Sequence, residues 1–262
     1  MSVRRFLTVN GVRLACIDFG GGGEPLLALH GHFSCARTFA GLAEALQGRW
    51  RVVAPDQRGH GWSDSPGDYS REAYVADAVA LIRRFQLAPA VVLGHSLGGL
   101  NAYQLAAWHP ELVRALIVEE IGAVMPADEL TCATADWPER FPSVRSVLDL
   151  LAAKGVANPT YFLESLVEHK EGWAFRFQYD HLHRSRQLLR GDWWADWLSS
   201  TCPALLLHGH KSWALTTKQA REMAARRPNT QLVEFPECGH TIHDEDPAGF
   251  QRAVESFLDS LE

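Results

Sequence analysis

The sequence lacks the features that mark several protein classes. Its 262 residues contain no apolar run close to the ~20 residues that a membrane-spanning helix needs, and no hydrophobic signal segment near Met1. No run of Lys or Arg exceeds a pair, and the formal net charge of −6 argues against a basic surface for nucleic acid or anionic lipid. We therefore expect a cytoplasmic monomer or homodimer whose partner is a small-molecule substrate, not nucleic acid or a membrane.

Cysteine is scarce and irregularly spaced. The five cysteines are an odd number and include no CxxC pair, which argues against a disulfide framework and a zinc knuckle. His208 and His210 are spaced like metal ligands but have no third ligand at a suitable spacing. Internal repeats and low-complexity segments are also missing. We expect free thiols, no metal, no cofactor and a core that is stable without cross-links, because a chain of this length buries most of its apolar surface.

Short apolar runs alternate with segments of helical periodicity, which is typical of a mostly parallel sheet covered by helices. The spacing predicts eight strands, at residues 6–9, 13–19, 25–30, 51–55, 90–94, 115–119, 204–208 and 231–235. It predicts helices at residues 37–46, 70–85, 97–108, 218–227 and 247–261. Asn10-Gly11 separates the first two strands and favours an antiparallel hairpin at the start of the sheet.

The alternation stops between residues 123 and 202, where no convincing strand is found and five of the nine tryptophans occur. A structureless loop of this length would be unusual, so the segment is interpreted as a helical lid inserted into a core formed by residues 1–122 and 203–262. Trp193, Trp194 and Trp197 fall on or near one helical turn, and we expect two of them to face the substrate pocket, with Trp194 as a substrate contact. Ordinary packing of the lid on the core is the alternative.

The most specific motif is Gly94-His95-Ser96-Leu97-Gly98, which follows a buried strand and precedes a helix. This G-x-S-x-G pattern predicts a sharp turn that presents the Ser96 hydroxyl at the carboxyl end of the sheet. The turn also places the backbone N–H of Leu97 at a helix N-terminus, where it can bind a developing oxyanion. Ser96 is therefore the candidate nucleophile.

With this motif, the sequence resembles the α/β-hydrolase family everywhere outside the lid. The resemblance extends to the blocks LALHG at residues 27–31, DQRGHG at 56–61 and Gly239-His240. It implies that His240 is the general base and that the His32 N–H is the second oxyanion donor. Phe33 and His95 are then the candidate substrate contacts, although histidine is common at the position of His95 in this family and is expected there to pack beneath the turn.

The triad acid departs from the commonest pattern of this family. Many members carry an aspartate after the seventh strand, but here that position is Ser212. Some members instead carry the acid at the end of strand six, where this sequence has Glu119 and Glu120. Neighbouring strand residues point to opposite sides, so only one of them should face His240. The resemblance favours Glu120, because its separation of 24 residues from Ser96 matches that in the members that use this strand.

Together these features predict a serine hydrolase that cleaves a carboxylic ester, thioester or lactone of a small apolar compound through an acyl-enzyme. A serine at position 96 argues against the members of the fold that attack with an aspartate. Two alternatives remain: a carbon–carbon bond hydrolase of the same fold, and a ligand-binding sensor with slow turnover.

Overall fold

An eight-stranded sheet forms the centre of the molecule. The computed structural model describes residues 2–125, 134, 136–156 and 158–261, so Cys132 lies outside the described residues. The strand order is β1-β2-β4-β3-β5-β6-β11-β12. The first three strands in this order pair antiparallel and the others are parallel. Their bounds are β1 Val3–Val9, β2 Val12–Asp18, β3 Glu24–Leu29, β4 Trp50–Pro55, β5 Ala90–His95, β6 Val113–Glu119, β11 Ala204–Gly209 and β12 Thr230–Phe235. All eight predicted strands and the mostly parallel architecture are confirmed.

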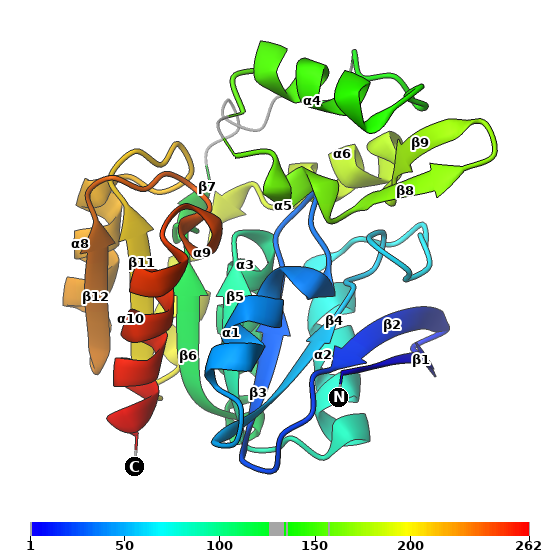
Figure 1. The fold of residues 1–262 in the computed structure, drawn as a ribbon. Helices are drawn as coiled ribbons and strands as arrows, with labels where there is room; N and C mark the ends of the chain where they lie inside the picture. Colours follow the sequence, from blue (N-terminus) through cyan, green and yellow to red (C-terminus); the bar gives the residue numbers. More distant parts are fainter. Residues whose placement is uncertain (1, 126–133, 135, 157, 262) are drawn as a thin grey trace.

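Helices cover both faces of the sheet (Figure 1). On one face pack α2 (Arg71–Phe85), α3 (Leu97–Trp108) and α8 (Thr217–Arg226). On the other pack the 3-10 helix η1 (Ala36–Phe39), α1 (Ala40–Ala45) and α10 (Pro247–Asp259). Short helices at η2 (Pro110–Leu112) and α9 (Ile242–Glu245) complete the core. The apolar residues of the central strands are buried between these layers, and this burial supplies most of the stability of the fold.

Local sequence signals account for where several elements begin. Asn10 and Gly11 both have positive φ, at 50° and 76°, as the tight turn between β1 and β2 requires. The Ser70 side chain accepts a hydrogen bond from the Ala73 N–H and caps the start of α2. Asp246 caps α10 in the same way, ahead of Pro247. These caps fix the helix starts close to the predicted positions.

The segment between β6 and β11 lies over the carboxyl ends of the central strands (Figure 1). Its helices are α4 (Val144–Ala153), α5 (Thr160–Leu163), α6 (Tyr179–Gln187) and α7 (Trp194–Ser199). It also contains two short antiparallel pairs, β8 (Leu166–His169) with β9 (Gly172–Phe175), and β7 (Val124–Met125) with β10 (Gly191–Asp192). Along the described parts of the chain, no helix is long and apolar enough to cross a bilayer.

The β8–β9 hairpin corrects the expectation of a purely helical insert. Gly172 has a φ of 120°, and a Cβ at this position would overlap the carbonyl of Phe141. Trp173 exchanges two backbone hydrogen bonds with Phe141, at 2.7 and 2.8 Å. The strands are only four residues long and depend on these tertiary partners, which is why the sequence pattern did not reveal them.

Candidate active site

The turn between β5 and α3 holds Ser96 in a strained conformation. Its φ of 52° and ψ of −115° lie outside the regions that residues other than glycine prefer. The turn is possible because Gly94 and Gly98 flank it: a Cβ on Gly94 would overlap the Gly98 carbonyl, and one on Gly98 would overlap the Leu29 carbonyl. The sequence motif thus produces the expected backbone turn at the carboxyl end of β5.

His240 faces Ser96 from the loop that follows β12. Its Nε2 lies 3.1 Å from the Ser96 Oγ, which is hydrogen-bonding distance. The indole of Trp213 packs beside the imidazole, with ring centroids 4.7 Å apart. The two side chains that the sequence selected as nucleophile and base are therefore brought together, although they are 144 residues apart in the chain.

Glu120 lies on the other side of His240, fully buried just beyond the end of β6. Its Oε2 is 3.7 Å from the His240 Nδ1, and neither atom has a hydrogen bond to any described residue. Its Oε1 accepts hydrogen bonds from the Gly209 N–H at 2.6 Å and the His208 Nδ1–H at 3.1 Å. Burial alone would raise the pKa of Glu120, but the hydrogen bond from His208 and the closeness of His240 outweigh it, so the pKa lies below its ordinary value. Glu120 is thus an ionised carboxylate facing His240.

Ser212 stands where many members of the family carry the triad acid, and it lies at the same carboxylate. Its hydroxyl adds to the lowering of the Glu120 pKa. A carboxylate is therefore supplied to this location from strand β6 instead of from the loop after β11. The structure agrees with the preference for Glu120 over Ser212, while the catalytic role itself stays a prediction.

Glu119, the alternative to Glu120, binds a different histidine. Its carboxylate oxygens each lie 2.9 Å from the His243 Nδ1, and Oε1 also accepts the His243 backbone N–H at 3.0 Å. Burial alone would lower the pKa of His243, but the charge and hydrogen bonds of Glu119 outweigh it and raise the pKa to about 9. Glu119 and His243 therefore form a buried ion pair that anchors the loop carrying His240.

His95 belongs to this supporting structure, which corrects its assignment as a substrate contact. Burial, with His240 and His243 nearby, holds the pKa of His95 well below its ordinary value. The neutral ring donates its Nε2–H to the backbone carbonyl of His240 at 2.7 Å. Its other nitrogen lies 3.4 Å from the Tyr161 hydroxyl of α5. The ring is fully buried between these partners and positions the His240 loop instead of meeting substrate.

The two amides expected to bind an oxyanion have no competing acceptor in the part of the chain that the structure describes. Among the described residues, neither the His32 N–H nor the Leu97 N–H donates to a protein group. Leu97 is the first residue of α3, where the helix dipole favours negative charge. The His32 backbone is held by Tyr161, whose hydroxyl donates to the His32 carbonyl at 2.7 Å. Both amides remain candidates for the oxyanion hole.

Phe33 joins an aromatic cluster contributed mainly by the insert. Its ring centroid lies 5.2 Å from that of Phe162 and 5.5 Å from that of Phe177. Trp137 packs on the same group at 6.3 Å. The cluster continues directly from the loop that carries His32, so Phe33 keeps its assignment as a candidate substrate contact.

Trp194 is not placed for the substrate contact that the sequence suggested. The Arg226 guanidinium of α8 lies 3.9 Å from its ring centroid. Trp197 on the same helix is fully buried against Tyr103 of α3 and donates its Nε1–H to the Met223 carbonyl at 3.0 Å. Helix α7 packs on the helical layer beside the sheet, where Trp197 is fully buried and Trp194 is partly buried, so the positions of both residues favour the alternative of ordinary packing.

The side chains that sequence reasoning missed are the histidines that bind the two glutamates. From the sequence, His208 is considered only as a metal ligand and His243 is given no role, because nothing in their local sequence connects them with the glutamates. His208 bridges Glu120 and the Thr217 hydroxyl, which is 3.0 Å from its Nε2. The usable signal was topological: β11 pairs with β6, and Leu207 is in register with Glu119. The residue after Leu207 must therefore lie near Glu120.

One group of side chains has the composition of a metal site. Ligand atoms of His95, Glu119 and His243 lie within 4.8 Å of one another. The chemistry of the group favours hydrogen bonding, because the Nδ1 proton of His243 is directed at Glu119 and the His95 Nε2 proton at a carbonyl. Both donors would have to be displaced or reoriented before a cation could bind here.

Comparison with known proteins agrees with this geometry. A sequence model described as the alpha/beta hydrolase family matches residues 26–253. The chain is 30% identical to the sn-1-specific diacylglycerol lipase of Mus musculus, over 89% of this chain and 80% of that protein. It is 28% identical to the 2-hydroxymuconate semialdehyde hydrolase of a Pseudomonas species, over 98% and 94%. The crystal structure of E-2-(acetamidomethylene)succinate hydrolase superposes with a TM-score of 0.91 at 25% identity, covering 99% of this chain and 100% of that chain. Taken with the turn at Ser96, these matches show that the chain belongs to the alpha/beta hydrolase family.

Proposed function

We propose that Ser96, His240 and Glu120 form a catalytic triad that hydrolyses a carboxylic ester, thioester or lactone of a small apolar compound. The observation that carries the proposal is the 3.1 Å contact between the Ser96 Oγ and the His240 Nε2, with the other ring nitrogen of His240 facing a buried carboxylate. A serine hydroxyl is a weak nucleophile until a positioned base removes its proton, and this arrangement supplies that base.

The proposed reaction has two halves. The Ser96 Oγ attacks the carbonyl carbon while His240 takes its proton, and the His32 and Leu97 amides stabilise the oxyanion. His240 then protonates the leaving group, and an acyl-enzyme forms. Water attacks the acyl carbon with His240 as base, which releases the acid and restores Ser96. Glu120 balances the charge of the imidazolium in both halves.

Two observations support an apolar carbonyl substrate. The aromatic cluster around Phe33 provides an apolar surface next to the loop of His32. Of the relatives named above, the lipase fits such a substrate, whereas the other two names specify a semialdehyde and a succinate, which are small polar compounds. Because those substrates differ, the class of bond must be tested directly.

A fluorophosphonate labelling experiment tests the nucleophile. The wild-type protein should be labelled covalently, and Ser96→Ala should not. Esters, thioesters and lactones of graded chain length, together with a diketone substrate for carbon–carbon cleavage, would then identify the bond. Turnover of the diketone alone would replace the ester assignment while keeping the triad, and equal labelling of Ser96→Ala would refute the triad.

A further inference from the structure

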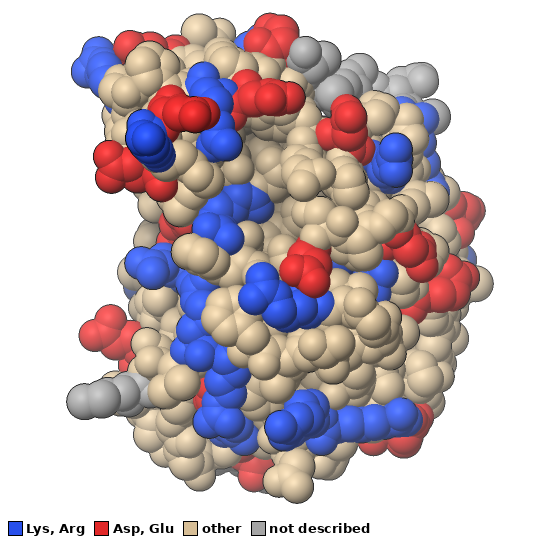
Figure 2. Space-filling model, turned by 90° about the vertical axis from the view of Figure 1, so that its right-hand side faces the viewer, with Lys and Arg blue, Asp and Glu red and all other residues tan. Residues whose placement is uncertain are grey.

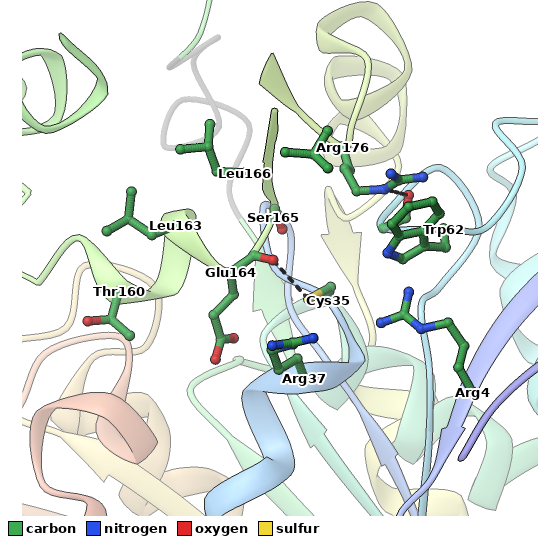
Figure 3. Close-up of a pocket in the computed structure, with 12 residues that line it drawn as sticks. Arg4, Cys35, Arg37, Trp62, Thr160, Leu163, Glu164, Ser165, Leu166 and Arg176 are labelled. Atoms are coloured by element: carbon green, nitrogen blue, oxygen red, sulfur yellow. Dashed lines mark hydrogen bonds between the residues drawn. The ribbon is translucent and has the colours of Figure 1, made fainter. Parts of the chain in front are cut away.

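We propose that a cavity between the core and the insert binds the oxyanion of a small organic acid, a carboxylate or a phosphate carried on an apolar body. The cavity has a volume of about 480 Å³, within the range of small-molecule sites. It is bounded by β1, by the loops that follow β3 and β4, and by the α5–β9 region, and Figure 3 shows its lining side chains. Ser96 and His240 do not line it, so the inference goes beyond the proposed hydrolysis.

Two arginines are held at this cavity by one tryptophan. The Arg176 guanidinium lies 3.2 Å from the ring centroid of Trp62, and its Nε donates to the Gly61 carbonyl at 2.9 Å. The Arg4 guanidinium lies 5.4 Å from the same ring. Figure 3 shows Arg176 and Arg4 approaching Trp62 from different sides. Stacking on an aromatic ring fixes the orientation of a guanidinium while leaving its edge donors available to a ligand.

The donors of these arginines are incompletely used within the described part of the chain. The Nη1 of Arg4 is buried and has no hydrogen bond, although the Asp56 Oδ2 lies 3.7 Å away. Asp56 itself accepts the backbone N–H groups of Ala36 and Trp62, both at 2.8 Å. A buried donor without an acceptor is costly, and an oxyanion in the cavity would satisfy it.

The charge of the lining favours an anion. Three of the twelve lining residues are arginines, with Arg37 completing the set, whereas Glu164 is the one carboxyl group among them. Burial and the neighbouring Asp244 raise the pKa of Glu164 to about 7. Near neutral pH this carboxyl group is therefore partly protonated and repels a bound anion less. Burial and the nearby charge of Arg4 lower the pKa of Arg176, despite the opposing effect of Asp56.

On the face of the molecule that carries β1 and β2, Figure 2 shows Lys and Arg gathered in a column, which would attract anions toward this region.

The remaining walls fit an apolar body. Leu163, Leu166 and Val167 line the cavity. The Ser165 hydroxyl donates to the Phe33 carbonyl at 2.7 Å, so the wall is tied to the loop that contains His32. Cys35, which follows His32 in this loop, lines the cavity, so the site can hold either an independent anion or the acidic end of a long substrate.

Calorimetric titration with phenyl phosphate and with phenylacetate tests the proposal directly, without using the hydrolytic reaction. The wild-type protein should bind at least one of the two probes. Arg176→Gln and Arg37→Gln should each weaken binding about tenfold or more, because each removes a charged donor from the cavity. Glu164→Gln should tighten binding at pH 8, where the carboxylate is ionised. Arg145→Gln is the matched control, since Arg145 lies on α4 and pairs with Asp149 at the surface.

Kinetics with two esters identify the source of the anion. If Arg176→Gln raises KM tenfold for an ester with a distal carboxylate but not for the matching neutral ester, the cavity holds the end of the substrate. If Arg176→Gln loses phenyl phosphate binding while its KM values for the two esters are unchanged, the ligand is an independent anion. The proposal is overturned if neither probe binds the wild-type protein, or if Arg176→Gln and Arg37→Gln change binding no more than Arg145→Gln. Arg37 is exposed, so Arg37→Gln should leave the fold intact. Its effect on probe binding therefore tests the proposal even if another variant fails to fold.

Discussion

The carboxylate of Glu119 lies 2.9 Å from the His243 Nδ1, and this pair stands directly beside the facing pair of Glu120 and His240. Two adjacent glutamates at the end of β6 thus face two histidines that are three residues apart in the segment that follows β12. The first pair holds the loop, and the second is the pair for which we propose a catalytic role. This division explains why two consecutive acidic residues can both be fully buried at a strand end.

Neutralising Glu120 should abolish most turnover. In Glu120→Gln the side chain keeps its shape but cannot balance the charge of an imidazolium, so kcat should fall on the order of 10⁴-fold. Ser212→Ala is the comparison, because it leaves the carboxylate in place, and it should cost far less. Steady-state kinetics on an activated ester would measure both, and near-normal turnover by Glu120→Gln would remove Glu120 from the mechanism.

His208 should contribute to turnover although it does not contact Ser96. Its Nδ1–H is one of two donors to the Glu120 Oε1, and hydrogen bonds to charged groups contribute about 1.5–3 kcal/mol. His208→Leu should therefore reduce kcat roughly tenfold to a hundredfold, with little change in KM. Thr217→Val, which removes only the hydroxyl at the far nitrogen of His208, is the matched control. Equal kinetics for His208→Leu and wild type would show that Gly209 and Ser212 are sufficient to orient Glu120.

The Glu119–His243 pair should make stability depend on pH. The pKa of His243 is raised to about 9 in the folded protein from about 6.5 in an unfolded chain. The native state therefore binds the extra proton, and this stabilisation is complete below about pH 6.5 and lost as the pH rises through about 9. At 1.36 kcal/mol per pKa unit the loss is on the order of 3 kcal/mol.

Urea unfolding at pH 6.5 and pH 9 measures this loss. The wild type should lose stability across the interval, whereas the double variant Glu119→Gln/His243→Asn should lose much less, because it has no such ion pair. An equal loss in both proteins would assign the pH dependence to other groups.

The sequence was sufficient to predict the fold and the three candidate triad positions, but not the residues that support them. Strands such as β5 and β6 are continuous apolar runs, and the turn at Ser96 is encoded by Gly94 and Gly98 themselves. These are properties of the local sequence, so they can be recognised without knowing which residues lie nearby in the folded protein. His208 and His243 acquire their roles only through pairing across the sheet and through the path of the α9 loop.

Trp194 illustrates the same limit. A tryptophan-rich helical turn is compatible with a pocket wall and with core packing, and the choice depends on where α7 docks. The stacking of Arg226 on Trp194 could not be read from either local sequence. Large aromatic residues in an insert are therefore weak predictors of substrate contact.

Substrate selectivity should depend on Phe33 and not on Trp194. Phe33→Ala opens space next to the loop of His32, so the preferred acyl chain should lengthen and the kcat/KM for short esters should fall roughly tenfold, since a buried aromatic ring contributes a few kcal/mol. Trp194→Phe should leave the chain-length profile unchanged. A series of esters from acetate to decanoate measures both profiles, and a changed profile for Trp194→Phe would restore the original assignment.

The position of the insert has a consequence for how the protein can change over evolution. The segment leaves the sheet after β6 and returns at β11, and these two strands are neighbours, with Ala204 in register with Leu116. Both ends of the insert are therefore fixed by the same ladder, and the entropy of closing such a loop grows only slowly with its length. Residues can be added to or removed from the insert without shifting the register that brings Glu120 to His240. The part of the chain that covers the carboxyl ends of the strands can thus diversify while the proposed triad keeps its geometry.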